Sequence, residues 1–318
     1  MSHDNEKPLD PKKALIISSR SFLGKFLRRN FLAKNMTVLG TSRSASQADS
    51  DCEQLDVNDP MALGRLLNRF QPDWVVQCSG ATNSHDPAEH YQSHVAGTLQ
   101  LLKGVFENVP KARVVLLGSA AEYGNVQEDN FPITEDSPCN PTSFFGASKL
   151  AQAHLAIAAA AQWELAIAQV RPFNICGPNS PMHYFLGSLI KRAFTIKSEN
   201  LSNALTIRNG MATRDFVDVR DVAQAIVGLL TSNVMTPGVC KILNIASGRE
   251  TSLIQVGEIL CNINGLTIQH ESDSSSRTGV QRSCGSSGRL SSLTGWEPTI
   301  SLEKSILDQW NEYSLTHS

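Results

Sequence analysis

The sequence predicts an α/β protein built on a Rossmann-type, doubly wound parallel sheet, followed by a smaller C-terminal lobe. Short apolar runs alternate with segments of helical periodicity from residue 14 to residue 172. Beyond residue 172 this regular alternation ends. The chain of 318 residues is also longer than a single core usually needs, which favours a second, smaller unit.

Five apolar runs are typical of buried strands, and they lie at residues 14–17, 36–41, 73–77, 113–117 and 165–170. The segments between them show helical spacing, near residues 22–29, 60–70, 87–107 and 146–162. Strands that alternate with helices in this way form a parallel sheet covered on both faces. Ligands of such a sheet bind at the carboxyl ends of its strands.

The same pattern divides the chain into three regions. Residues 1–13 are polar, and we expect them to be disordered. Residues 14–172 form the Rossmann domain, and residues 173–318 form mainly a substrate lobe, with some segments returning to the first domain. Within the second lobe we expect a helix near 183–195, a strand near 204–207, a helix near 219–232 and a flexible Ser/Gly-rich loop over 272–288.

The composition is that of an ordinary globular protein, with 41% hydrophobic residues, 18% charged residues and a formal net charge of -2. No strong charge attracts nucleic acid or an anionic membrane, so the expected partner is a small molecule. No apolar run reaches the ~18 residues that cross a bilayer. The seven cysteines are scattered, without a C-x-x-C pair, which is typical of reduced thiols. These features predict a cytoplasmic protein without a nucleic-acid or membrane partner.

No metal site is expected. His90 and His94 lie four residues apart on a predicted helix. The segment between them has no glutamate base, however, and no cysteine cluster elsewhere completes a tetrahedral set of ligands. The pair is therefore interpreted without a metal.

The turn after the first strand is the natural place for a phosphate, because the amides and dipole of a helix N-terminus favour an anion. A dinucleotide fold normally has glycine at three positions of this turn, whereas Ser18 and Ser21 occupy two of them and only the packing glycine, Gly24, is present. A serine can donate to phosphate, but its Cβ reduces clearance and disfavours a positive φ. The turn alone is equally consistent with a structural turn and with a nucleotide site that includes Phe22 and Leu23.

The end of the second strand bears on the choice of cofactor. A site for NAD(H) usually has an acidic residue there for the ribose hydroxyls, whereas this chain has Arg43. Arg43, together with Arg20, can bind a 2′-phosphate, which favours NADP(H) over NAD(H). A solvated loop arginine explains Arg43 equally well when it is considered alone.

An ordered series of motifs extends over nearly the whole chain. Gly-Ser-Ala-Ala-Glu-Tyr-Gly follows the fourth strand at residues 118–124, and Phe-Gly-Ala-Ser-Lys lies at 145–149. The other motifs are Asp-Val-Asn-Asp at 56–59, Arg-Pro-Phe-Asn-Ile-Cys-Gly-Pro at 171–178, Arg-Asp-Phe-Val-Asp-Val-Arg-Asp at 214–221, Asn-Ile-Ala-Ser-Gly at 244–248 and Thr-Gly-Trp-Glu-Pro at 294–298. Through them the chain resembles the extended short-chain dehydrogenases/reductases of the NAD(P)-dependent nucleotide-sugar epimerase/dehydratase family. Within that family it is most similar to GDP-4-keto-6-deoxymannose reductases and related 4-ketosugar reductases.

The resemblance implies the catalytic residues. In the family a serine or threonine at the position of Ser119 and a Tyr-x-x-x-Lys pair act on a sugar hydroxyl or ketone beside the nicotinamide. Lys149 is retained and would hold the nicotinamide ribose, but Phe145 stands where the proton-donating tyrosine should be. A phenyl ring cannot exchange a proton, and the loss of a positioned general acid typically lowers the rate roughly a hundred- to ten-thousandfold.

Phe145 has three explanations: an engineered substitution, a natural loss of activity, or a natural shift of the proton donor to another group. Engineering would change one position, whereas Ser18, Ser21 and His94 also depart from the family pattern. We therefore favour natural divergence. His94 and Tyr123 are candidate donors, although a buried, hydrogen-bonded histidine without a catalytic role is the favoured interpretation of His94, and Tyr123 in the family more often positions the substrate.

The remaining contacts are also implied by the resemblance. Asp56 and Val57 would lie on the adenine side of the cofactor. The predicted substrate contacts are Ser119, Glu122, Tyr123, Asn174, Arg214 and Arg289, whose arginines suit a diphosphate. The helix near 146–162 has a face of small residues, and the family forms homodimers through such helices, although a buried intrachain helix would look similar.

The sequence therefore predicts an oxidoreductase that modifies a nucleotide-linked 4-keto-6-deoxyhexose, as a reductase or an epimerase, with NADP(H). The alternative is a catalytically impaired or non-redox homologue that binds a nucleotide sugar or serves as a partner subunit. Binding of a nicotinamide nucleotide distinguishes the two. A protein that binds neither NAD(H) nor NADP(H) is no oxidoreductase of this kind, while sugar-nucleotide binding would survive.

Overall fold

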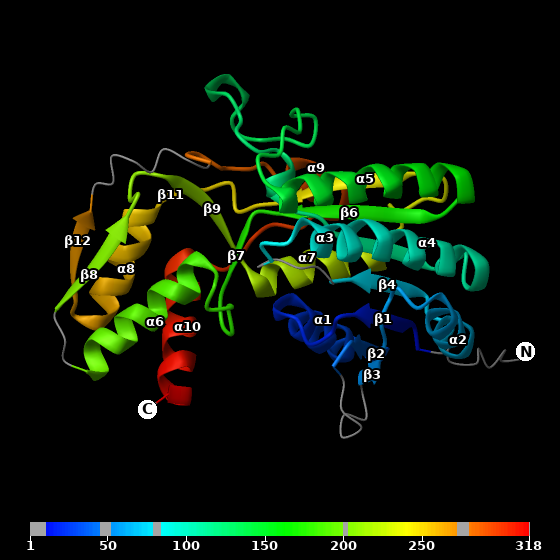
Figure 1. Ribbon diagram of the computed structural model, residues 1–318, viewed down its shortest axis with the longest axis horizontal. Helices are drawn as coiled ribbons and strands as arrows, with labels where there is room; N and C mark the ends of the chain where they lie inside the picture. The colour runs from blue at the N-terminus through cyan, green and yellow to red at the C-terminus, as the bar shows by residue number, and fades with distance from the viewer. Residues whose placement is uncertain (1–10, 45–51, 79–83, 200–202, 272–279, 318) are drawn as a thin grey trace, which may run out of the picture.

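The structure is a computed structural model that describes residues 11–44, 52–78, 84–199, 203–271 and 280–317. Its largest element is a parallel seven-stranded sheet in the order β10-β6-β5-β4-β1-β2-β3 (Figure 1). The strands are β1 (Lys13–Ile17), β2 (Thr37–Ser42), β3 (Cys52–Gln54), β4 (Trp74–Gln77), β5 (Arg113–Leu117), β6 (Ala166–Pro172) and β10 (Cys240–Ile245). The predicted Rossmann-type sheet is confirmed.

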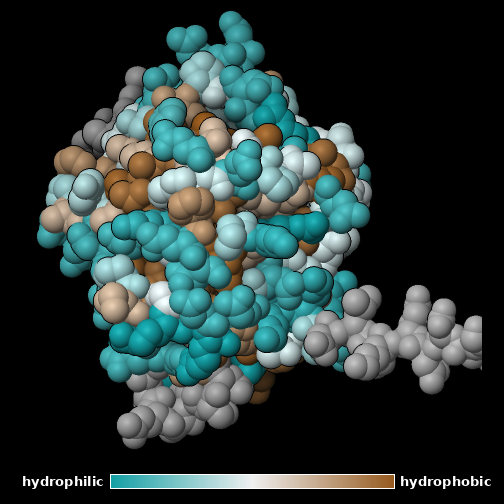
Figure 2. All heavy atoms as spheres, turned by 90° about the vertical axis from the view of Figure 1, so that its right-hand side faces the viewer, coloured by the Kyte–Doolittle hydropathy of each residue, from teal (hydrophilic) through white to brown (hydrophobic). Residues whose placement is uncertain are grey.

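Helices cover both faces of this sheet because its central strands are apolar on both sides. Every residue of β4 and of β6 is buried. One face is covered by α1 (Phe22–Ala33) and α7 (Val219–Thr231), and the other by α2 (Pro60–Phe70), α4 (Gly97–Asn108) and α5 (Phe144–Trp163). In the view of Figure 2, hydrophilic side chains surround smaller groups of hydrophobic ones, as expected where helices bury one side and expose the other.

The helix expected over residues 87–107 is divided into three parts. The first, α3 (Pro87–His90), begins after Asp86, whose carboxylate accepts a hydrogen bond from the amide of Ala88 at 2.9 Å. A π-helical segment, η1 (Tyr91–Ala96), follows and leads into α4. Such segments are rare and often occur at functional sites. This one brings His94 against α5.

The second lobe has its own apolar core, formed by α6 (Phe185–Ser198), α8 (Leu253–Asn264) and α10 (Leu302–His317) together with two small sheets. In one sheet β8 (Ala204–Arg208) pairs with β12 (Thr267–Glu271); in the other β9 (Thr213–Asp218) lies between β7 (Asn174–Cys176) and β11 (Glu250–Ser252). The remaining short helices are η2 (Ala120–Glu122), η3 (Glu128–Asn130) and α9 (Gly288–Thr294). Figure 1 shows this lobe beyond one end of the large sheet.

Two elements beyond residue 172 lie with the Rossmann domain. β10 pairs with β6 at the edge of the large sheet. The helix near 219–232, which the sequence analysis placed in the second lobe, is α7, and its placement is corrected. Its apolar residues share a core with Leu27 and Phe31 of α1, because the stripe of Val222, Ile226 and Leu229 fits the uncovered face of the sheet.

Two predicted segments, the N-terminal region and the Ser/Gly-rich loop, fall partly outside the described residues. The disordered region predicted for residues 1–13 falls mostly outside the described residues, although Lys13 already belongs to β1. Residues 272–279 of the predicted flexible loop are also outside them. Within the described ranges, no helix has the length and apolarity to cross a membrane, and no group of three or more His, Cys, Asp or Glu side chains could hold a metal ion. All seven cysteines are free thiols.

Candidate active site

Two adjoining cavities lie at the carboxyl ends of the strands, where the order of the large sheet reverses between β1 and β4. In a doubly wound sheet this is the position at which ligands bind. Ser18 directly follows β1, Cys78 directly follows β4, and Ser119 comes shortly after β5. Ser18 lines the smaller cavity, Ser119 lines the larger one and Cys78 lines both. The two cavities therefore form one candidate site.

The smaller cavity has a volume of about 140 Å³ and lies beside the turn after β1. Its wall includes five predicted cofactor contacts, Ser18, Ser21, Arg43, Asp56 and Val57. The structure thus brings together residues that are far apart in the sequence. Arg20, predicted to act with Arg43, donates from Nη1 to the carbonyl oxygen of Ser44 at 3.0 Å, on the same loop as Arg43.

The turn after β1 keeps a left-handed residue, the conformation that favours glycine, although serines replace two of the expected glycines. Ser18 has a φ of 64°, in the left-handed region that few residues other than glycine adopt. Ser21 caps α1, and its Oγ accepts a hydrogen bond from the amide of Gly24 at 3.2 Å. A Cβ at Gly24 would lie only 2.7 Å from the carbonyl oxygen of Ser19, so the close packing of turn and helix requires glycine there.

The other two predicted contacts at the start of α1 do not line either cavity. Leu23 is buried in the core between α1 and the sheet. The ring of Phe22 meets the ring of Tyr184 edge-on, with the centroids 6.3 Å apart. Both residues still contribute backbone N–H groups to the helix N-terminus, which is the part of a helix that binds an anion.

Ser18→Gly is expected to tighten the binding of a nicotinamide dinucleotide several-fold. Glycine adopts a positive φ without steric conflict, and removal of the Cβ opens the cavity beside the turn. The relieved strain of about 1 kcal/mol is largely offset by the greater freedom of glycine in the unfolded chain, so the Tm should change little. Isothermal titration with NADPH measures the effect. Asn209→Gly, at another positive-φ position away from both cavities, is the matched control, and an unchanged affinity in Ser18→Gly would contradict the prediction.

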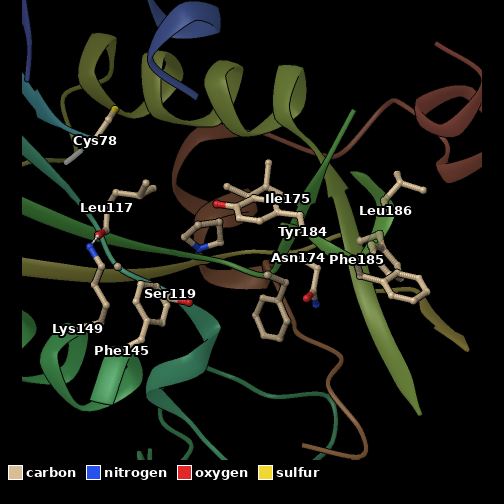
Figure 3. A pocket seen from close by; sticks show the side chains of 14 residues that line it. Cys78, Leu117, Ser119, Phe145, Lys149, Asn174, Ile175, Tyr184, Phe185 and Leu186 are labelled. Carbon is tan, nitrogen blue, oxygen red and sulfur yellow. Dashed lines mark hydrogen bonds between the residues drawn. The ribbon is translucent and has the colours of Figure 1, made fainter. Parts of the chain in front are cut away.

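The larger cavity has a volume of about 280 Å³ and is lined by three of the five predicted catalytic positions, Ser119, Phe145 and Lys149 (Figure 3). Ser119, Phe145, Lys149 and Asn174 all line it. Ser119 and Lys149 come from the end of β5 and from α5, and Asn174 is the first residue of β7. Figure 3 shows the ring of Phe145 beside Ser119 and Lys149.

Ser119 is held by a capping box at the start of η2. Its Oγ accepts from the amide of Ala121 at 3.1 Å, and its own amide donates to the Glu122 carboxylate at 2.9 Å. Glu122 is fully buried and forms an ion pair with Arg171, with Nε and Oε2 2.8 Å apart. Burial raises the pKa of Glu122, and the Arg171 charge opposes this rise. The structure therefore places Glu122, predicted as a substrate contact, behind Ser119 as a support.

Tyr123 also lies in the interior and does not line the cavity. Its side chain is 0% exposed, and its hydroxyl donates to Asn244 Oδ1 at 2.7 Å and accepts from Arg171 Nη1 at 3.0 Å. Burial raises the pKa of this phenol to about 12. These contacts correct the candidate roles of Tyr123 as proton donor and substrate contact, because a hydroxyl enclosed in this way reaches neither solvent nor the cavity.

Lys149 presents a fixed ammonium group at the cavity wall. Lys149 is only 3% exposed. Its Nζ atom donates to the Leu117 carbonyl oxygen at 2.6 Å and to Gln152 Oε1 at 3.2 Å. Burial lowers the pKa of Lys149 to about 8, while Glu122 and Cys78 act in the opposite direction. An ammonium group has three donors, so one remains for a ribose hydroxyl or a developing negative charge.

His94 lies behind Phe145, away from the cavity. The two rings meet edge-on with centroids 5.5 Å apart, and His94 is 0% exposed. The Ser148 hydroxyl donates to the carbonyl oxygen of Phe145, so the His94 Nδ1 atom, 2.8 Å from Ser148 Oγ, must carry a proton. Burial lowers the pKa of His94 to about 2, with the charges of Lys149 and His90 adding to the effect. The structure thus supports a neutral, buried histidine and gives no support to a proton relay.

The predicted substrate contacts beyond β6 are not all at the cavity. Asn174 lines it and donates to the Asp215 carbonyl at 3.1 Å. The guanidinium of Arg214 donates to two backbone carbonyl groups at 2.7 and 2.8 Å, and desolvation lowers its pKa. Arg289 forms an ion pair with Asp136 at 2.6 Å. Neither arginine lines the two cavities, and their contact with a diphosphate stays a prediction.

Part of the larger cavity is formed by residues that are not among the predicted catalytic and binding residues. The additional wall is aromatic or apolar and comes from both domains: Cys78, Phe173, Tyr184, Phe185 and Phe216. In the sequence, such residues look like ordinary core residues, because only the approach of the second lobe to the large sheet exposes them to a cavity. A signal existed only for two thiols: Cys78 and Cys176 lie near predicted strand ends and could face the pocket, and of the two Cys78 lines the cavity.

The fold and this site define a class of protein, one with a Rossmann-type dinucleotide-binding fold. The turn after β1, residues 18–21, is called the phosphate turn; the cavity beside it adjoins the cavity lined by Ser119 and the buried Lys149. In agreement with this, a family model described as "NAD dependent epimerase/dehydratase family" matches residues 14–246. The chain belongs to this family, and its fold is that of the extended short-chain dehydrogenases/reductases.

Characterised relatives are similar over most of the chain. GDP-6-deoxy-D-mannose reductase of Pseudomonas aeruginosa is 29% identical over 268 residues, covering 80% of this chain and 85% of the relative. dTDP-6-deoxy-L-talose 4-dehydrogenase (NAD(P)(+)) of Kitasatospora kifunensis is 24% identical over 312 residues, covering 96% of each. The solved structure of RMD from Pseudomonas aeruginosa complexed with NADPH is 25% identical, with a TM-score of 0.83 and coverage of 96% and 99%.

Proposed function

We propose that the protein is an NADP(H)-dependent oxidoreductase that reduces the ketone of a nucleoside-diphosphate 4-keto-6-deoxyhexose. The observation that carries this proposal is the meeting of two sets of residues at one site. Ser119 and the buried ammonium of Lys149 line one cavity, and the phosphate turn with Arg43 lines the cavity that adjoins it at Cys78. The names of the relatives, a GDP-6-deoxy-D-mannose reductase and a dTDP-6-deoxy-L-talose 4-dehydrogenase, support a nucleoside-diphosphate 6-deoxyhexose as the substrate class.

The residues present fit a nicotinamide dinucleotide. Ser18 has the positive φ that glycine usually supplies in such a turn, and the first turn of α1 has no acidic residue that would repel an anion. Lys149 would hold the nicotinamide ribose, and Ser119 would orient the sugar oxygen. When bound, the cofactor supplies hydride to the ketone carbon. The chain itself must then exclude water and provide a proton at the ketone oxygen.

Arg43→Ala is expected to weaken NADPH binding roughly tenfold or more and to leave NADH binding within about twofold, because charge-assisted hydrogen bonds to the 2′-phosphate are lost. Titration calorimetry with both nucleotides measures this difference. Arg65→Ala, which removes an exposed arginine on α2, is the control for the change in net charge. An equal loss for both nucleotides would show that Arg43 does not select NADP(H).

The proposed function is tested first by binding and then by turnover. Thermal shifts are measured with NADPH, NADH and GDP-, dTDP- and UDP-linked sugars. Oxidation of NADPH is then followed with nucleoside-diphosphate 4-keto-6-deoxyhexoses. We expect a larger shift with NADPH than with NADH and consumption of NADPH with one of these substrates. A protein that binds neither nicotinamide nucleotide would overturn the proposal.

A second candidate function is favoured by Phe145 alone. A phenyl ring occupies the position of the family's acid, so a homologue that binds a nucleotide sugar without turnover is the alternative. It predicts binding of the sugar nucleotide, no oxidation of NADPH with any ketosugar, and no gain on replacement of Phe145 by tyrosine.

The oligomeric state is a further part of the proposal. Leu99 and Phe106 on α4 and Ile157 on α5 are exposed large apolar side chains on neighbouring helices. They support a homodimer formed through these helices, as the family resemblance implies. Sedimentation velocity tests it, and a monomer at micromolar concentration would contradict it.

A further inference from the structure

We propose that Tyr184 donates the proton that the family's missing tyrosine would otherwise supply. The inference rests on the proposed function, because it concerns reduction of a ketone in the same cavity. Phe145 leaves the protein without the family's proton donor, and neither of the donors predicted from the sequence, His94 and Tyr123, reaches the cavity.

The four tyrosines of the chain are all among the described residues, and their positions single out Tyr184. Tyr123 is enclosed by Arg171 and Asn244, as described above. Tyr91 is 60% exposed on η1, and Tyr313 belongs to α10 in the second lobe. Only Tyr184 lines the larger cavity with Ser119 and Lys149.

The position of the Tyr184 ring suits a proton donor. Tyr184 immediately precedes α6, and its ring extends into the cavity, with the hydroxyl end directed to the side where Leu117 and Lys149 lie (Figure 3). Edge-on contact with Phe22, at 6.3 Å between centroids, places the ring next to the phosphate turn. The phenol therefore lies in the same cavity as Ser119 and Lys149, next to the start of the helix that follows the turn after β1.

Other ionisable groups of the cavity are less suitable. Cys78 is buried, and burial raises the pKa of its thiol to about 12. Lys149 already donates to Leu117 and Gln152, and its position at the wall suits a ribose contact. His94 lies behind Phe145. A phenol carries a proton at neutral pH and can give it to a ketone oxygen, because its reference pKa is near ~10.

The proposed step balances as follows. The Tyr184 hydroxyl gives its proton to the ketone oxygen while the ketone carbon takes up hydride from the reduced nicotinamide. The π bond of the carbonyl breaks, one C–H bond and one O–H bond form, the substrate is reduced to the alcohol and the nicotinamide is oxidised. The phenolate of Tyr184 then regains a proton from water.

Tyr184→Phe tests the hydroxyl alone, because it keeps the ring and its contacts. We expect kcat for ketone reduction to fall at least about 100-fold, as for loss of a general acid. The calorimetric affinities for NADPH and for the product sugar nucleotide should stay within about twofold, because the ring still fills the same space. Tyr91→Phe, at an exposed tyrosine outside the cavities, is the matched control and should change neither quantity.

The outcomes separate this inference from the proposed function. A wild-type protein that turns over a 4-ketosugar while Tyr184→Phe retains its kcat overturns the inference alone, and points to Lys149 or water as the donor. A loss of affinity that equals the loss of kcat/KM also overturns it, since the hydroxyl would then be a binding group. A wild-type protein that binds neither nucleotide overturns both proposals. A selective loss of kcat, with binding retained, supports the inference.

Discussion

Phe145→Tyr is expected to restore at least about 100-fold of the kcat that Tyr184→Phe loses. The new phenol would stand beside Ser119 and one helical turn from Lys149 on α5, in the place where the family has its acid. In the wild-type background the same substitution should add less than about tenfold, because Tyr184 already donates the proton. Single-turnover oxidation of NADPH in the four combinations of these two positions measures the coupling.

A substitution at the neighbouring residue of α5 is the control for Phe145→Tyr. Phe144→Tyr adds a hydroxyl to the neighbouring, exposed ring of α5, outside the cavity, and should restore nothing. If Phe145→Tyr raises kcat equally in both backgrounds, the two phenols act independently and Tyr184 is not the donor. If it raises kcat in neither background, the cavity does not present a ketone to Ser119, and the non-catalytic alternative gains support.

Lys149→Met is expected to lower turnover about 100- to 1,000-fold and yet to stabilise the protein without ligands. The ammonium is buried and forms no ion pair with a carboxylate among the described residues. Burial of this charge therefore lowers the free energy of unfolding of the wild type. Methionine keeps most of the volume, and the Leu117 carbonyl still accepts from Gln152 Nε2 at 3.2 Å. Denaturant unfolding of both proteins at pH 7 measures the gain.

The pH dependence of the free energy of unfolding tests whether the buried charge of Lys149 destabilises the folded state. The folded-state pKa of Lys149 is about 8 and its ordinary value is 10.5, so between these values the unfolded chain binds more protons. The free energy of unfolding of the wild type should therefore rise with pH across this window, relative to Lys149→Met, by at most about 3 kcal/mol. Below pH 8 the difference should be constant. A difference that does not change between pH 8 and 10 would contradict the proposed burial cost.

Most strands and helices of the Rossmann domain were predicted because each has a local signal in the sequence, whereas β3 and β10 were not among the predicted strands. β4 and β5 are short apolar runs, and α2 begins after Asp59, whose carboxylate accepts from two helix amides. η1 had no such signal, because a π-helical segment and an α-helix have the same composition. α7 looked like an element of the second lobe, since its amphipathic pattern does not say which of two apolar faces it covers.

Some residues of the candidate site were predicted from the sequence, and the positions of others were decided only by the structure. Ser18 was predicted from its place in the turn between a strand and a helix, whereas Ser119 and Lys149 were predicted from the family motifs to which they belong. Whether a side chain faces a cavity or the interior depends on neighbours from other elements. Glu122 and Tyr123 follow Ser119 directly, yet both point into a buried network with Arg171 on β6.

By itself, then, the sequence determined the parallel sheet, the order of its elements, the retained lysine and the absence of the expected tyrosine. Only the tertiary structure decided which phenol stands in the cavity. Tyr184 lies outside every motif, and its ring enters the site because the segment before α6 packs against Phe22 at the start of α1. A contact between residues so far apart in the chain is set by the packing of two domains, for which no local pattern in the sequence exists.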